Sequence, residues 1–210
     1  MKIVEPSWEV LWAASGSEML RLIELAGRTS YKSEGVIASD SAPAFVQRLI
    51  SRGHFSVLEH VSISARVICD RGVSHEIVRH RIASYTQEST RFCNYSDAKF
   101  GSEITVVRPS FLVGVGEDDP SYRIWQEAML ACETAYLKLL SEGAKPEHAR
   151  SVLPNSLKTE LLMTMNVREW RHFFALRTAP ASHPDMRRIA SGLLDDFRGH
   201  VDVLFSSFDA

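Results

Sequence analysis

Residues 61–69, VSISARVIC, constrain the fold more than any other segment because apolar and polar side chains alternate along them. The apolar set is Val61, Ile63, Ala65, Val67 and Cys69, and the polar set is Ser62, Ser64 and Arg66. Successive side chains of a β-strand point to opposite faces. The segment is therefore predicted to be a half-buried strand, with a sheet as part of the fold.

The other periodic segments are mostly helical. The apolar spacing predicts helices over residues 17–27, 41–53, 73–81, 121–143, 146–154, 167–177 and 186–208, strands over 104–113 and 157–166, and a loop over 83–91. These elements predict an α+β fold with helices packed around a modest, mostly antiparallel sheet. No repeat or linker divides the chain, so a single domain over residues 1–210 is expected.

Charge and cysteine content exclude several classes of protein. Lys plus Arg number 24 and Asp plus Glu 26, so no overall basic field favours nucleic acid or an anionic membrane, and anion recognition has to be local. The three cysteines are far apart, which fits neither a disulfide framework nor a thiolate zinc site. The N-terminus lacks the layout of a signal peptide, and no apolar run approaches the ~20 residues of a membrane span. We expect a soluble, cytoplasmic protein.

Four of the eight histidines, His54, His60, His75 and His80, fall within residues 54–80 and suggest a metal at first sight. Their spacings of six and five residues differ from the tight HExxH pattern of zinc sites on one helix face. No metal is therefore expected. His60 and His75 are equally well explained as polar residues that satisfy a turn.

The segment RHRIASYTQESTRF, residues 79–92, is rich in arginine. A guanidinium matches phosphate or carboxylate with a planar fork of donors, so Arg79, Arg81 and Arg91 could converge on an anion. Ser84, Ser89 and Thr90 would add hydroxyl donors. The alternative is a surface face of salt bridges to Glu76 and Glu88.

A third polar group lies in residues 150–188: Arg150, Asn166, Arg168, His172, Arg177 and Arg187. Arg168 and His172 are one helical turn apart, so they could line one edge of a pocket. The signal is weak by itself.

Together these segments resemble the flavin-dependent thymidylate synthases. RHR, seven residues and a serine (Arg79–Arg81, then Ser89) resemble the family signature. GHFSVLEH at 53–60, EHARSVLP at 147–154 and MNVREWRHFFALR at 165–177 resemble further family blocks in the expected order.

The resemblance implies an enzyme, a methyltransferase that makes dTMP from dUMP for thymidylate biosynthesis. It implies methylenetetrahydrofolate as carbon donor, FAD as bound cofactor, NADPH as reductant, and a homotetramer with shared active sites. No cysteine nucleophile is implied. The remaining alternatives are a zinc-dependent hydrolase and a non-catalytic nucleotide- or RNA-binding module.

The resemblance also implies roles for residues. The dUMP ligands would be Glu76, Arg79, Gln87, Glu88, Ser89, Arg91, Arg150 and Arg177. The FAD ligands would be His54, Ser56, Arg79, His80, Arg81, Gln87, Asn166, Arg168 and His172. Arg177 would be catalytic, because it would stabilise negative charge on the uracil ring.

The chain departs from the family pattern at some positions. Glu76 stands where many members have glutamine, and a carboxylate near phosphate or uracil would be repulsive unless protonated or paired. His172 stands where some members have asparagine, which adds a titratable group. TAPASHPDMRR, residues 178–188, keeps the paired arginines but otherwise differs, so His183 and Asp185 are given no role.

Overall fold

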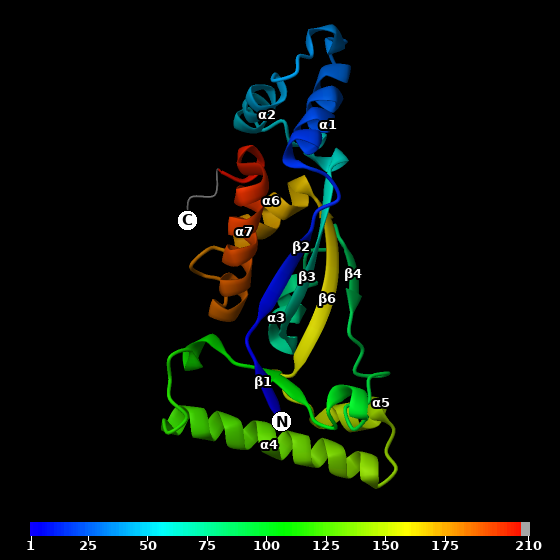
Figure 1. Cartoon of the computed structure of the whole chain (residues 1–210), viewed down its shortest axis with the longest axis vertical. Helices are drawn as coiled ribbons and strands as arrows, with labels where there is room; N and C mark the ends of the chain where they lie inside the picture. The colour runs from blue at the N-terminus through cyan, green and yellow to red at the C-terminus, as the bar shows by residue number, and fades with distance from the viewer. Residues whose placement is uncertain (207–210) are drawn as a thin grey trace. The chain divides into compact units, whose positions relative to one another are not determined.

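The computed structural model describes residues 1–206, and its helices and strands are labelled in Figure 1. The strands are β1 (Lys2–Val4), β2 (Ser7–Leu11), β3 (Ser62–Asp70), β4 (Ser84–Gln87), β5 (Thr105–Val107) and β6 (Lys158–Asn166). The helices are α1 (Gly16–Thr29), α2 (Ala42–Ser51), α3 (Arg71–Ile77), α4 (Pro120–Ser141), α5 (Pro146–Ala149), α6 (Val167–Arg177) and α7 (Pro184–Phe205). The predicted α+β class is confirmed.

The main sheet has the strand order β2-β3-β6-β4, whereas β1 pairs in parallel with β5. The predicted alternation along β3 is confirmed, because Ile63, Ala65 and Val67 are buried and Ser62 and Arg66 are exposed. β6 alternates in the same way.

The described chain forms two compact units. Unit 1 contains Met1–Ser7, Val67–Arg79 and Thr86–Leu161, and unit 2 contains Trp8–Arg66, His80–Tyr85 and the described residues from Leu162 on. One boundary falls inside the RHR motif, between Arg79 and His80. The single domain over residues 1–210 stays a prediction.

Unit 2 has an aromatic core that holds α6 and α7 together. Trp170, Phe173 and Phe174 of α6 are fully buried, and so is Phe197 of α7, whose ring centroid lies 4.8 Å from that of Trp170. The Trp170 indole N–H also donates to the carbonyl of Ile63 in β3, at 3.0 Å. Helix α6 is thus held against α7 by aromatic packing and against β3 by a buried hydrogen bond.

Unit 1 is built around the long helix α4. The buried residues of this core are Tyr95, Ile104, Val106, Met129, Tyr136, Ala149 and Leu157. The N-terminal ammonium pairs with Glu103 at 2.8 Å and with Glu133 at 3.1 Å. These contacts hold β1 and β5 beside the helix.

Several predicted element boundaries were wrong. The expected loop over 83–91 contains β4, because its short polar run pairs with β6 at the edge of the sheet. The expected strand over 104–113 ends at Val107, since Pro109 has no N–H for a ladder and opens the 3₁₀ turn Ser110–Leu112. β1 and β2 were missed. The last helix ends at Phe205, and Phe208 lies outside the described residues.

No helix among residues 1–206 is both long and apolar enough to cross a lipid bilayer.

Candidate active site

Helix α6 carries the polar residues of unit 2 and begins where β6 ends. The Asn166 side chain accepts a hydrogen bond from the backbone N–H of Glu169 at 2.9 Å and so caps the helix. The cap sets the rotation of the first turn. Arg168 and His172 are exposed, whereas Glu169, one turn before His172, is 8% exposed.

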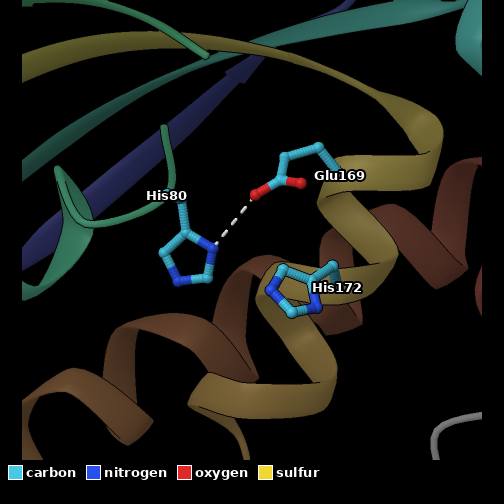
Figure 2. Close-up of side chains that lie close together, drawn as sticks. All are labelled: His80, Glu169 and His172. Carbon is cyan, nitrogen blue, oxygen red and sulfur yellow. Dashed lines mark hydrogen bonds and ion pairs between the residues drawn. The ribbon is translucent and has the colours of Figure 1, made fainter. Parts of the chain in front are cut away.

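His80 lies at the centre of a buried hydrogen-bond network, and Figure 2 shows its contact with Glu169. Its Nδ1 is 3.2 Å from Oε1 of Glu169, and its Nε2 accepts a hydrogen bond from Nε of Arg177 at 3.1 Å. The hydroxyl of Tyr85 donates to the His80 carbonyl at 2.8 Å. The RHR segment and the two ends of α6 therefore meet at one imidazole.

Burial lowers the pKa of His80 to about 4, with smaller electrostatic contributions from Arg177 and His172. The ring is thus neutral near pH 7. Burial raises the pKa of Glu169, and it raises the pKa of Tyr85 to about 12. All three shifts have the same main cause, which is a cluster shielded from solvent.

His80, Glu169 and His172 place their ligand atoms within 4.8 Å of one another, which raises the question of a metal site (Figure 2). A neutral histidine binds a metal with one nitrogen and carries its proton on the other. If Nδ1 of His80 bound a metal, the proton would sit on Nε2 and face the N–H of Arg177. The arginine contact is therefore unfavourable for a metal ligand at His80.

Two pockets open around α6 in unit 2. One has a volume of about 470 Å³ and is lined by Glu59, Ile82, Asn166, Arg168, Glu169 and His172. The other, of about 300 Å³, is lined by Phe55, Arg168, Arg171 and His172. Arg168 and His172 belong to both, and Arg168 pairs with Glu59 at 2.6 Å.

The pockets offer polar groups for the phosphates of a dinucleotide, namely the guanidinium of Arg168, the amide of Asn166 and the imidazole of His172. Ile82 and Phe55 offer apolar surface for its ring. The residues of these pockets therefore fit a flavin. His80 is only 4% exposed, so its side chain lies behind this surface.

Unit 1 holds a separate pocket of about 380 Å³. Its lining residues are Arg71, His75, Thr90, Arg150, Ser151, Leu153, Pro154, Asn155 and Leu157. Arg150 donates to the hydroxyl of Thr90 at 3.4 Å, so the arginine of the 147–154 block meets the end of the RHR loop. Two guanidiniums and an imidazole make this pocket suitable for an anion.

Gln87 and Glu88, in the segment after the RHR motif, make their side-chain hydrogen bonds and ion pairs within unit 1. The amide of Gln87 donates to the hydroxyls of Ser74 and Thr159, each at 3.1 Å. The carboxylate of Glu88 pairs with Lys158 at 2.7 Å and accepts from the Tyr95 hydroxyl at 2.9 Å.

Arg91 pairs with Glu147 at 3.0 Å, and the Ser89 hydroxyl accepts from the Arg91 N–H at 3.3 Å. Arg91 thus does make a salt bridge, as the surface alternative expected, although its partner is neither Glu76 nor Glu88.

The predicted site residues divide between the units. Unit 1 contains the proposed dUMP ligands except Arg177, namely Glu76, Arg79, Gln87, Glu88, Ser89, Arg91 and Arg150. Unit 2 contains the proposed FAD ligands except Arg79 and Gln87, namely His54, Ser56, His80, Arg81, Asn166, Arg168 and His172, and it also contains Arg177. The expected convergence of three guanidiniums stays a prediction, because Arg81 belongs to unit 2 and the other two to unit 1.

The prediction from sequence overlooked Glu169 and Tyr85 beside His80, and Arg71 beside Arg150. Glu169 had a signal, because it precedes His172 by three residues on a predicted helix and so shares its face. Tyr85 and Arg71 had none, since their contacts depend on how the loop and the strand ends meet.

Comparison with known proteins places this geometry in context. A family described as thymidylate synthase complementing protein matches residues 13–201. The chain is 35% identical over 191 residues to the flavin-dependent thymidylate synthase of Geobacter sulfurreducens, covering 87% of this chain and 79% of that protein. It is 32% identical over 199 residues to the flavin-dependent thymidylate synthase of Pyrococcus furiosus, covering 94% of this chain and 77% of that protein.

Among solved structures, a UMP/dUMP methylase, PolB from Streptomyces cacaoi bound with 5-Br dUMP, superposes with a TM-score of 0.78 and 24% identity, covering 99% of this chain and 96% of that one. At this identity the likeness establishes a shared fold.

Proposed function

Because the chain belongs to the flavin-dependent thymidylate synthase family, we propose that it converts dUMP to dTMP by reductive methylation. Methylenetetrahydrofolate would supply the carbon and NADPH the reducing equivalents. FAD, when bound, supplies hydride transfer. The comparisons give no support to a zinc-dependent hydrolase or to an RNA-binding module.

The observation that carries the proposal is the hydrogen bond between Arg177 and His80. These residues come from two family-like blocks 97 positions apart, and they lie 3.1 Å from each other. The contact is the one expected if both blocks build a single site.

The chain's own residues have the following roles in the proposal. Arg150, with Thr90 and Arg71 around the unit 1 pocket, binds the phosphate of dUMP. Arg168, Asn166 and His172 hold FAD at the pockets around α6. Arg177 places a permanent positive charge at the uracil ring, where it stabilises developing negative charge.

The remaining dUMP ligands, Glu76, Arg79, Gln87, Glu88, Ser89 and Arg91, and the remaining FAD ligands, His54, Ser56, His80 and Arg81, are part of the same proposal. Among them Gln87 and Glu88 have their partners within unit 1, which would hold them in place for the nucleotide.

A cysteine nucleophile is not needed. Cys69 is buried on β3, and burial raises the pKa of its thiol, so little thiolate forms near pH 7. Cys93 and Cys132 are half-buried, and neither lines the pockets described above.

The proposed assembly is a cytoplasmic homotetramer with shared active sites. Four small molecules have to bind, while the polar residues are divided between two units of modest size. Sites completed by a second subunit would supply the additional walls.

The test combines a spectrum with an assay. The purified protein should show flavin absorption, and it should form dTMP from dUMP only when methylenetetrahydrofolate and NADPH are both present, as measured by mass spectrometry. Arg177→Ala should lower the rate of dTMP formation about a hundred- to a thousandfold in a folded protein, since one such electrostatic donor supplies about 3–4 kcal/mol of transition-state stabilisation. A colourless wild-type protein that forms no dTMP after reconstitution with FAD would refute the proposal.

A further inference from the structure

The Arg177 guanidinium is hydrogen-bonded to His80, which in turn contacts Glu169. Its Nε donates to Nε2 of His80 at 3.1 Å, and the other nitrogen of the same ring is 3.2 Å from Oε1 of Glu169. We propose that Glu169 is a positioning residue, which acts through His80 to hold the side chain of Arg177 in its catalytic orientation.

The hydrogen bonds permit only one tautomer of His80. An arginine N–H can only donate, so Nε2 of the ring must offer a lone pair. The single proton of the neutral imidazole then sits on Nδ1 and points at Glu169, whose carboxyl oxygen accepts it. A carboxylate that accepts from one ring nitrogen fixes the tautomer and orientation of an imidazole for work at the other nitrogen.

The surroundings keep this chain of three residues rigid. Tyr85 donates to the His80 carbonyl at 2.8 Å, and the rings of His80 and Phe173 are 4.9 Å apart at their centroids. Asn166 caps the turn that carries Glu169. The positively charged or titratable groups beside His80 are Arg177, His172 and Tyr85, and Glu169 is the carboxyl that contacts its ring.

Glu169 also lines the pocket of about 470 Å³, so a direct contact with FAD is the competing explanation. Its low exposure of 8% and its contact with Nδ1 favour the role behind the surface. The two explanations differ in one respect. A positioning residue loses its effect when Arg177 no longer contacts His80, whereas a direct ligand of FAD does not.

The inference rests on the proposed function. A double-mutant cycle in kcat separates the positioning role of Glu169 from a direct contact with FAD. Glu169→Gln should lower kcat for dTMP formation about ten- to hundredfold, because a neutral amide accepts the Nδ1–H more weakly than a carboxylate and can also turn its own N–H toward Nδ1, which favours the wrong tautomer. The KM for dUMP should change less than kcat. Lysine at position 177 has no guanidinium Nε, so in an Arg177→Lys background Glu169→Gln should change kcat by less than about twofold.

The matched control is Glu9→Gln, which removes an exposed carboxylate paired with Arg66 at 2.8 Å in the same unit. It should leave kcat within about twofold of the wild type in both backgrounds. Equal losses from Glu169→Gln with arginine or lysine at position 177 would overturn the inference. A wild-type protein without dTMP formation would instead refute the proposed function.

Two further measurements do not depend on the folding of Glu169→Gln, and the first of them does not depend on turnover. Ring ¹⁵N chemical shifts of His80, assigned by their loss in His80→Gln, should report the Nδ1–H tautomer at pH 7, and an Nε2–H or doubly protonated ring would overturn the inference. Glutamine at position 80 can donate to Glu169 and accept from Arg177, so His80→Gln should retain at least about tenfold more kcat than His80→Leu. Equal loss in these two variants would contradict the positioning role.

Discussion

Gly192 is the position where a single methyl group should do the most damage to unit 2. It lies in α7, and a Cβ built there would be 2.7 Å from Cε2 of Trp8 and nearer still to the Cζ2 and Cη2 atoms of the same indole. The ring cannot turn away without losing the hydrogen bond that its N–H donates to Asp196 at 3.0 Å. We therefore expect Gly192→Ala to displace Trp8 of β2.

The size of the effect follows from three contributions. Forcing an extra methyl into a packed contact costs about 1–3 kcal/mol. Losing the indole hydrogen bond costs about 1 kcal/mol, and the better helix propensity of alanine returns about 1 kcal/mol. The net loss in the free energy of unfolding is about 1–3 kcal/mol, which corresponds to a fall in Tm of about 2–12 °C for a chain of this size.

Thermal unfolding followed by circular dichroism measures this change, and α7 offers its own control. A Cβ at Gly199 would meet no atom within 4 Å, so Gly199→Ala should leave Tm unchanged or raise it by a few degrees. Replacing Trp8 by leucine in the Gly192→Ala protein should remove most of the methyl clash. A Gly192→Ala protein as stable as Gly199→Ala would show that the close approach of Trp8 to α7 is not present in solution.

The remaining predictions concern pH, thiols and assembly. His80 has a folded-state pKa of about 4 against 6.5 for an unperturbed ring, so the unfolded chain binds its proton first. Its contribution to stability, at most on the order of 3 kcal/mol, is fully present above pH 6.5 and is lost as the pH falls toward 4. Chemical denaturation should show a steeper loss across this range in the wild type than in His80→Gln, and parallel slopes would contradict it. Alanine should replace each of the three cysteines, Cys69, Cys93 and Cys132, one at a time without loss of dTMP formation. Loss of turnover in a folded variant would indicate that a cysteine thiolate takes part in the reaction. Added FAD should raise Tm by mass action, and light scattering should report a tetramer. An inactive Arg177 variant and an inactive Ser89 variant should regain partial activity when refolded together, whereas a monomer that still forms dTMP would rule out shared sites.

Much of the local structure was evident from short-range patterns. The alternation in residues 61–69 depends only on the two-residue period of a strand, and β3 follows it. VREWRHFFALR has a polar cap before it and a 3.6-residue apolar spacing, and α6 has the predicted bounds. The prediction of a loop over residues 83–91 was wrong because the polar composition of this segment resembles a loop. Only the neighbouring strand β6 supplies the backbone partners that make part of it a strand.

The sequence by itself determined the α+β class, the family and the residue types available for binding anions, because periodicity and motif spacing are properties of neighbouring positions. Tertiary structure alone decided which of those residues touch. His80, Glu169 and Arg177 are separated by up to 97 positions, and their hydrogen bonds exist because the aromatic core of unit 2 holds α6 against the His80 segment. No short-range pattern encodes that contact. The same burial lowers the pKa of His80, so the protonation state of the site is also a property of the packed fold and not of the motif.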